Sequence, residues 1–424
     1  MTARIETMAR VFEPIPDGWE LKEVGQVAEI NPESVDPTRN FRERQFSYID
    51  IESVQGGGAG ITNAQSLAGR DAPLRARRLV RVQDVIMSTV RPYLKAFAIV
   101  PIEYDNQICS TGFAVLRSKG GIISRYLLYA LLSDRVIEQC SRRMVGAQYP
   151  ALTGTQVQKI RILLPPLPEQ RKIAEILTAV DRTINKIEEI IEKTERFRKG
   201  LMQRLLTRGI GHKEFKETEI GKMPREWQLK ELEEVAHINR ESRDPARECP
   251  DGRFFYVDID SVENGTGVFR NVREVVGKDA PSRARRVVRH NDVIMSTVRP
   301  YLKAFAIVPQ TYDNQISSTG FAVLTCKQNI LPIYLLYALF SDPFVQQCNK
   351  AMVGGQYPAL NSSQVARIMV PIPSPLEQQK IAEILNTVDR RLELLRQKKQ
   401  RLERTKAGLM NDLLTGRKRV KLAP

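Results

Sequence analysis

The residues of this chain best suited to bind a ligand are arginines, which occur in two matching clusters. Each cluster has four members and directly precedes an apolar run. The clusters comprise Arg75, Arg77, Arg78 and Arg81 and, 208 positions later, Arg283, Arg285, Arg286 and Arg289. Because guanidinium groups form charge-assisted hydrogen bonds with phosphates, a repeated cluster predicts contact with a polyanion. A solvated surface cluster is the alternative interpretation.

A second candidate is the motif RPYLK, which follows the apolar run in both places. Its cationic and aromatic side chains are Arg91, Tyr93 and Lys95 in the first copy and Arg299, Tyr301 and Lys303 in the second. The proline breaks the preceding strand, so these side chains are expected on a turn. A structural tyrosine at the domain edge is equally compatible with the pattern.

A third candidate is the loop GAQYPAL at 146–152, matched by GGQYPAL at 354–360. Glutamine can bond an adenine edge, so the motif predicts DNA contacts from Gln148, Tyr149, Gln356 and Tyr357. A packing turn is the alternative.

No combination of residues indicates catalysis. The chain lacks the phosphate-binding, zinc-protease, hydrolase and amino-methyltransferase motifs, and His212, His237 and His290 have no matching partners in the other copy. The glycine cluster at 56–60 is best read as a surface turn. The acidic pairs Asp50/Glu52 and Asp258/Asp260 could hold a metal, but a solvated strand face is the preferred interpretation.

The chain is an internal duplication. The eighteen residues Asp84–Pro101 recur unchanged as Asp292–Pro309, and the same offset holds from Trp19/Trp227 to Leu206/Leu414. About 200 residues form a complete domain, whereas solenoid repeats are far shorter. Two similar domains are therefore expected.

Composition narrows the class of partner. The 424 residues carry 65 Lys and Arg against 49 Asp and Glu, a formal charge of +16, which favours nucleic acid. No apolar run approaches a membrane span and the N-terminus lacks a signal-peptide pattern, so a cytoplasmic protein is expected. The five cysteines lack metal-ligand spacing and are expected to be reduced.

Each domain is expected to be α+β and rich in strands. One helix is predicted at about 123–140, and the predicted strands lie at 48–53, 79–90, 96–101, 112–116 and 159–164. Prolines then mark a strand end and a helix start, and Ser374, Pro375 and Glu377 form the N-terminal signature of a helix.

Two long helices follow the two domains. Apolar residues recur in alternating steps of four and three from Ile173 to Leu205 and from Ile381 to Leu413, with few interruptions. Each helix could pack on its own domain, but the length of the stripes favours pairing with the other. The short linker near Gly209 cannot return along a rod of about 60 Å, so an antiparallel pair with pseudo-two-fold symmetry is expected. The expected segments are 1–165 (domain 1), 166–209 (helix 1), 210–373 (domain 2), 374–416 (helix 2) and 417–424 (basic tail).

Taken together, these motifs resemble the specificity (S) subunit of type I restriction-modification systems. The resemblance covers nearly the whole chain and is carried by DVIMSTVRPYLK, the GxQYPAL loop, the helix start PPLPEQxxIAEIL with its second copy, and KxEIGKMPxxW. It implies two target recognition domains, an antiparallel coiled coil of conserved spacer helices and no active site. It further implies binding to double-stranded DNA, to two methylation (M) subunits and to restriction (R) subunits. S-adenosylmethionine, ATP and Mg belong, by the same resemblance, to the partner subunits.

One departure from the family is informative. Its members commonly carry dissimilar recognition domains, whereas these two are close copies, so the expected DNA site is an interrupted palindrome or nearly one. Apolar residues off the helix stripe are expected to bind the methylation subunits: Ile176, Ile190, Phe197 and Leu394. A free-standing symmetric DNA-binding regulator, or the specificity subunit of a related two-component restriction system, remains an alternative.

Overall fold

The computed structural model describes residues 15–421 except 59, 145–149 and 353–357. The chain divides into two compact units. Unit 1 consists of residues 1–190 and 395–424, and unit 2 of residues 191–394. Each unit thus contains one copy of the duplicated domain together with part of each long helix.

The domain of unit 1 has two four-stranded sheets, ordered β6-β3-β10-β7 and β2-β11-β8-β9, and a pair β1-β12. The strands are β1 (Glu20–Glu23), β2 (Ala28–Ile30), β3 (Gln45–Ile49), β4 (Val54–Gln55), β5 (Gly60–Ile61), β6 (Gln65–Ala68), β7 (Ala76–Val80), β8 (Val85–Ser88), β9 (Phe97–Ile99), β10 (Gln107–Ser110), β11 (Phe113–Ser118) and β12 (Arg161–Leu164). The helices are α2 (Val24–Val27), α3 (Pro37–Asn40), α4 (Ser124–Leu132), α5 (Asp134–Arg143), α6 (Gly154–Gln158) and the long α7 (Leu167–Arg208).

The domain of unit 2 repeats this topology, with sheets β18-β17-β22-β19 and β16-β23-β20-β21 and a pair β15-β24. The strands are β13 (Phe215–Lys216), β14 (Met223–Pro224), β15 (Gln228–Glu231), β16 (Ala236–Ile238), β17 (Arg253–Val257), β18 (Arg273–Val276), β19 (Ala284–Val288), β20 (Val293–Ser296), β21 (Phe305–Ile307), β22 (Gln315–Ser318), β23 (Phe321–Cys326) and β24 (Met369–Ile372). The helices are α8 (Leu232–Val235), α9 (Pro245–Glu248), α10 (Pro332–Phe340), α11 (Asp342–Ala351), α12 (Ser362–Ala366) and the long α13 (Pro375–Leu414).

The apolar residues of β8 do not alternate with polar ones, because both faces of this strand are buried. Val85 and Met87 belong to the core that β8 forms with α4, whereas Ile86 faces the second sheet. A strand covered by a helix layer and by another sheet has no solvated side, so its residues do not alternate with polar ones. The equivalent strand β20 divides its residues between two cores in the same way.

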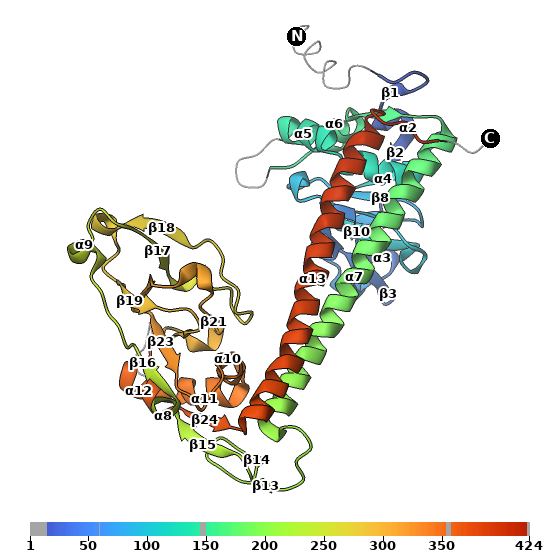
Figure 1. Cartoon of the computed structure of the whole chain (residues 1–424). Helices are drawn as coiled ribbons and strands as arrows, with labels where there is room; N and C mark the ends of the chain where they lie inside the picture. Colours follow the sequence, from blue (N-terminus) through green and yellow to red (C-terminus); the bar gives the residue numbers. More distant parts are fainter. Residues whose placement is uncertain (1–14, 59, 145–149, 353–357, 422–424) are drawn as a thin grey trace. The chain divides into compact units, whose positions relative to one another are not determined.

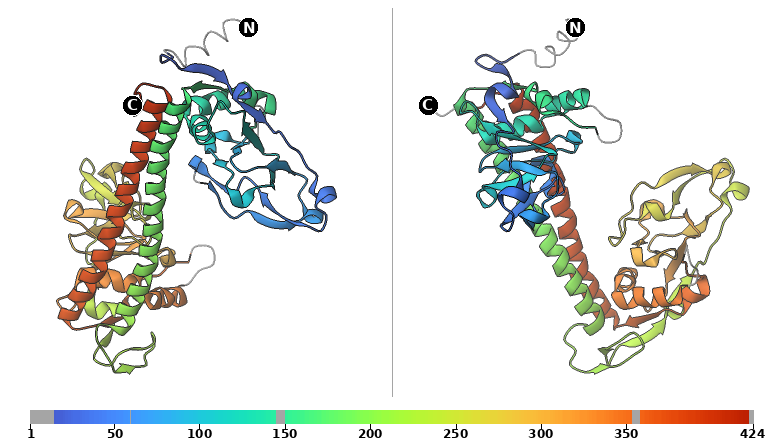
Figure 2. Two further views of the ribbon diagram at one scale, coloured as in Figure 1. Left: turned by 90° about the vertical axis from the view of Figure 1, so that its right-hand side faces the viewer. Right: turned by 180° about the vertical axis from the view of Figure 1, so that it is seen from behind.

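Within each unit, the parts of the helices α7 and α13 that belong to it lie side by side, as Figures 1 and 2 show. Within unit 1, Lys406 pairs with Asp181 at 2.6 Å and Lys399 with Glu188 at 2.6 Å. A step of seven residues forward along α7 therefore corresponds to a step of seven residues back along α13, so the two helices run antiparallel. In unit 2, an ion pair of Arg198 with Asp389 likewise joins the two helices.

These pairs explain the polar residues that interrupt the apolar stripe. Lys399, Lys406 and Arg198 occupy stripe positions, and each bonds a carboxylate on the facing helix. Polar residues in a coiled-coil seam cost stability but fix register and orientation. The ends of the stripe pack on a domain, as the alternative prediction had it: Ile173 and Leu177 belong to the domain core of unit 1, as do Leu413 and Leu414. Both predicted kinds of packing therefore occur.

In each unit, a tryptophan of the domain also bonds a glutamate in the first turn of one long helix. Trp19 Nε1 donates to Glu169 at 3.1 Å, and Arg419 also bonds this carboxylate. In unit 2, Trp227 Nε1 donates to Glu377 at 2.9 Å, and His212 lies 3.0 Å from the same side chain. Ser374 Oγ accepts from Glu377 N, as expected of an N-cap, but the glutamate side chain turns to the tryptophan.

Several predicted boundaries were wrong. The stretch 79–90 is two strands of different sheets, because Asp84 accepts from Arg81 N and turns the chain between them. The helix predicted at 123–140 breaks at Ser133, whose extended backbone separates α4 from α5. The strand predicted at 48–53 ends at Ile49, where Asp50 accepts from Ser53 N and Oγ in a turn.

Candidate nucleic-acid interface

The RPYLK motif and the GxQYPAL loop, 50 residues apart in sequence, meet in unit 1. Arg91 N donates to Pro150 O at 3.1 Å, and Leu152 N donates to Thr89 O at 2.9 Å. Val90 and Ala151 form the antiparallel bridge between these bonds. The end of the GxQYPAL loop is thus fixed alongside the start of RPYLK.

The arginine cluster joins the same place through the turn Ser110–Gly112. Thr89 donates to Gly112 O through both N and Oγ1 at 2.8 Å, and Thr111 N donates to Arg75 O at 2.7 Å. The four segments 73–75, 89–95, 110–112 and 150–152 are therefore connected by backbone hydrogen bonds. We call this surface basic edge 1.

Unit 2 builds the same surface, basic edge 2, from residues 281–283, 297–303, 318–320 and 358–360. Thr319 N donates to Arg283 O at 2.8 Å, and Thr297 N to Gly320 O at 2.8 Å. Leu360 N donates to Thr297 O at 2.9 Å, and Val298 bridges Ala359. The sequence repeat is thus also a repeat of this non-local arrangement.

RPYLK forms a strained, outward-facing turn in each edge. Arg91 and Lys95 flank a single 3-10 turn, Pro92–Leu94, with left-handed φ values of 47° and 56°. Non-glycine residues in this conformation are destabilised and persist where the surroundings hold them, which is common at binding sites. The turn exposes 46% of Tyr93 and 59% of Leu94. Lys95 Nζ anchors it by an ion pair of 2.9 Å to Asp134.

In basic edge 2, Arg299 and Lys303 have the same left-handed backbone, and Tyr301 is 45% exposed. Lys303 Nζ bonds Phe340 O at 2.8 Å and Asp342 at 3.2 Å. Both predicted DNA-binding lysines thus hold the turn in place, while the tyrosines face solvent.

The arginines within each cluster differ in the partners of their side chains. Arg75 and Arg283 are exposed, and within the described residues their side chains have no hydrogen-bond or ion-pair partner. Pro73 O accepts from Ala76 N at 2.9 Å, so Arg75 lies at the tip of a tight turn. These two arginines are the cluster members best placed to contact an external anion.

Arg77 and Arg81 instead bond carboxylates of their own domain. Arg77 lies 3.6 Å from Asp36, and Arg81 bonds Glu33 at 3.1 Å. Arg81 together with Arg117 lowers the pKa of Glu33 to about 2. The counterparts behave alike, since Arg285 pairs with Asp244 at 3.3 Å and Arg289 with Glu241 at 2.8 Å. These carboxylate partners could not be predicted from the sequence.

Arg78 and Arg286 form a third class. The Nε atom of each is buried and has no hydrogen-bond partner among the described residues. Burial lowers the pKa of Arg286. A buried guanidinium nitrogen without a hydrogen-bond partner is energetically costly.

Two exposed threonines in these edges were not singled out from the sequence. Thr111 and Thr319 lie at the centre of the Ser-Thr-Gly turns, and their backbone amides hold the arginine turns. The repeat of STG at 110–112 and 318–320 was the available signal. The predicted contacts Gln148, Tyr149, Gln356 and Tyr357 lie outside the described residues.

The predicted partner-binding residues differ in exposure. Phe197 is 60% exposed on α7 and Leu394 66% exposed on α13, and both belong to unit 2. Ile176 and Ile190 are half-buried, and Ile176 packs against the core of unit 1. Phe197 and Leu394 are therefore the stronger candidates for a protein contact.

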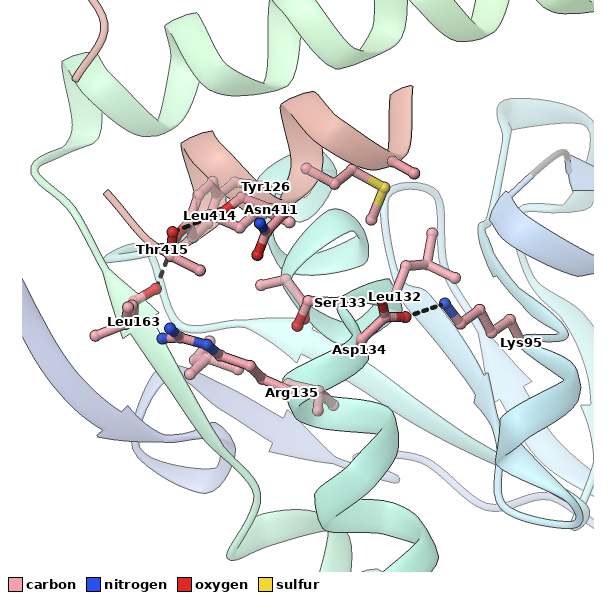
Figure 3. Close-up of a pocket in the computed structure, with 15 residues that line it drawn as sticks. Lys95, Tyr126, Leu132, Ser133, Asp134, Arg135, Leu163, Asn411, Leu414 and Thr415 are labelled. Carbon is pink, nitrogen blue, oxygen red and sulfur yellow. Dashed lines mark hydrogen bonds and ion pairs between the residues drawn. The ribbon is translucent and has the colours of Figure 1, made fainter. Parts of the chain in front are cut away.

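A cavity of about 110 Å³ in unit 1, shown in Figure 3, lies between the domain and the end of α13. Tyr126, whose hydroxyl donates to Leu163 O at 2.7 Å, lines it together with Asn411 and Thr415. This volume is small for a cofactor or drug-sized ligand.

Three further findings concern the described residues only. They contain no group of three or more His, Cys, Asp or Glu side chains that could hold a metal ion. None of their helices is long and apolar enough to cross a membrane. All five cysteines are free, and burial raises the pKa of Cys140 to about 12.

A family model described as the type I restriction modification DNA specificity domain matches this chain twice, over residues 16–196 and 224–404. The two matches begin 208 residues apart, the offset of the internal repeat. Because they cover more than half of the sequence, the chain belongs to this family of type I restriction-modification specificity subunits.

Two similar proteins come from Methanocaldococcus jannaschii. The type I restriction enzyme MjaVIII specificity subunit is 29% identical over 321 residues, which is 74% of this chain and 75% of that protein. The putative MjaX specificity subunit is 26% identical over 420 residues, 96% of this chain and 95% of that protein.

Solved structures agree with the fold. A chain from a type I restriction-modification system, whose structure concerns complex assembly and conformational transition, aligns with a TM-score of 0.60 at 25% identity, covering 94% of this chain and 98% of that one. The specificity subunit of M. genitalium aligns with a TM-score of 0.56 at 12% identity, covering 97% and 98%, and so supports the fold alone. The expected family and fold class are both confirmed.

Proposed function

We propose that this chain is the DNA-reading, non-catalytic subunit of a type I restriction-modification complex and that each unit reads one half of a bipartite site. The observation that carries the proposal is the repeated basic edge. Each edge combines an exposed arginine, Arg75 or Arg283, with an exposed tyrosine on a strained turn, Tyr93 or Tyr301. Arginine suits phosphates and guanine edges, and aromatic side chains add apolar contact with bases.

The two half-sites are alike because the two edges are alike. Of the residues in the RPYLK turn and the Ser-Thr-Gly turn, none differs between the copies. The antiparallel pairing of the helices within each unit suits the reading of inverted, separated half-sites. The proposed target is therefore an interrupted palindrome or a close approximation to one, with an unread spacer.

The long helices are the proposed platform for the partner subunits. Phe197 and Leu394 expose apolar surface that the α7–α13 pairing leaves uncovered. Methylation subunits would bind there, and restriction subunits would join the assembled complex. The methylation and cleavage chemistry, with its S-adenosylmethionine, ATP and Mg, would belong to those subunits, acting on DNA in the cytoplasm.

The test is to map methylated bases in cells that carry this chain with its methylation partner. A bipartite motif with two similar, inverted halves is the expected result. Cells that carry the partner and an Arg75→Ala, Arg283→Ala chain are the matched control, in which methylation of that motif should fall strongly. Two unrelated half-sites would contradict the proposal that two similar edges read the two half-sites. Methylation without sequence preference would contradict the proposed DNA-reading function.

A further inference from the structure

We propose that Leu74 and Ser282 are specificity-determining residues that make the two half-sites differ at one base pair. The inference rests on the proposed function and assigns a recognition role within it. It follows from the comparison of the two basic edges, which are otherwise built from the same residues.

Within the described residues of the two edges, one position differs between the copies. The segments 89–95, 110–112 and 150–152 are identical to 297–303, 318–320 and 358–360. The segment 73–75 reads Pro-Leu-Arg, whereas 281–283 reads Pro-Ser-Arg. Any difference in what these parts of the two edges read must therefore arise at Leu74 and Ser282.

Both residues occupy a prominent position. Ala76 N donates to Pro73 O at 2.9 Å, which places Leu74 beside Arg75 at the tip of a tight turn. In unit 2 the bond from Ala284 N to Pro281 O, 2.8 Å long, places Ser282 beside Arg283 in the same way. The buried Ala76 and Ala284 anchor the two turns, so both tips are held firmly.

Leu74 is 87% exposed, more than any other large apolar side chain among the described residues. A single exposed leucine is common on protein surfaces and needs no explanation alone. This one, however, lies next to the arginine whose side chain has no partner in the described part of the chain. An apolar group beside a phosphate-binding cation is well placed to touch a base when DNA binds.

The chemistry of the two side chains predicts different preferences. The C5-methyl group of thymine is the apolar feature of the major groove, so Leu74 should favour a T·A pair. The hydroxyl of Ser282 both donates and accepts, and serine bonds to more than one base. Unit 2 should therefore tolerate several bases where unit 1 requires T·A, and the palindrome should be imperfect at this position.

The experiment compares the complete chain, bound to its methylation partner, with the variants Leu74→Ser and Ser282→Leu. Methylation rates are measured on duplexes that carry each base pair at every position of the two half-sites. Leu74→Ser should reduce the preference for T·A in one half-site about tenfold, the scale of a single mismatched pair, and make the halves alike. Ser282→Leu should create the same preference in the other half-site.

Misfolding cannot account for the expected results of the two variants, because one variant loses a base preference and the other gains it at an exposed position. If the wild-type complex selects a bipartite site and both variants keep its preferences unchanged, the inference is wrong and the proposed function stands. If the wild-type complex selects no sequence, the inference and the proposed function are both wrong.

Discussion

Replacing Arg117 by threonine should destabilise unit 1, and the chain itself supplies the comparison. In unit 1, Arg117 donates to the buried Asp84 from Nε at 3.0 Å and from Nη2 at 2.9 Å. In unit 2 the arginine is replaced by Thr325, whose hydroxyl donates to Asp292 at 2.7 Å. The side chain of Asp84 is 2% exposed, so solvent cannot replace the lost partner.

The expected magnitude follows from these contacts. Removing one partner of a buried ion pair costs about 3–5 kcal/mol, because the other charge stays buried. The threonine hydroxyl returns about 1 kcal/mol as a hydrogen bond, as it does at Asp292. Arg117→Thr should therefore lower the free energy of unfolding of unit 1 by about 2–4 kcal/mol.

The assay uses the two tryptophans, since Trp19 reports on unit 1 and Trp227 on unit 2. In a Trp227→Phe background, urea unfolding followed by fluorescence should show a lower midpoint for Arg117→Thr. In a Trp19→Phe background the midpoint should not move. An unchanged Trp19 transition would refute the reasoning that this ion pair stabilises the sheet.

The reverse substitution, Thr325→Arg, tests the electrostatics of unit 2. Burial raises the pKa of Asp292, and the hydrogen bond from Thr325 partly offsets the effect. The folded chain thus holds this proton more tightly than the unfolded chain, so the stability of unit 2 should decline as pH rises above about 4. An arginine at position 325 should reduce this decline, and an unchanged pH profile of the Trp227 signal would contradict it.

Three other predictions concern binding, assembly and acid stability. Arg75→Ala should reduce the slope of log affinity for DNA against log salt by about 0.9, the loss of one phosphate contact, whereas Arg196→Ala on α7 should leave it unchanged. Phe197→Asp should reduce co-purification with the methylation subunit at least several-fold while near-ultraviolet circular dichroism of the chain stays the same; undiminished assembly would count against the docking surface. Because the pKa of Glu33 is lowered to about 2, its contribution to stability should be complete above about pH 4.5 and decline toward pH 2; Glu33→Gln should remove that part of the acid dependence.

The duplication and the long helices could be predicted from the sequence because both are periodic signals. The 208-residue offset needs only the alignment of the chain with itself, and the stripe from Ile173 to Leu205 repeats every heptad. The antiparallel direction also followed from the short linker. The ion pair of Lys406 with Asp181 confirms it within unit 1.

The grouping of the candidate residues could not be predicted in the same way. Arg75, Arg77 and Arg81 are neighbours in sequence, yet only Arg75 is exposed without a described partner. The carboxylates that bond the other two, Asp36 and Glu33, lie some 40 residues earlier. Such contacts depend on strand order, which local patterns do not encode.

That these motifs lie close together could not be predicted for the same reason. The hydrogen bonds that connect Thr89, Gly112 and Leu152 link three segments spread over 60 residues. The sequence identified each motif as a candidate but gave no means to place them together. The Ser-Thr-Gly turn between them, which holds the arginine turn, lacks charge and was overlooked for that reason.

Hydroxyl-radical footprinting of the assembled complex on its own site is the most direct test of two like surfaces reading one duplex. Two protected tracts separated by an accessible spacer are the expected result, with Arg75→Ala weakening one tract and Arg283→Ala the other. A single continuous tract, or equal loss from both tracts in each variant, would contradict the assignment of one half-site to each unit.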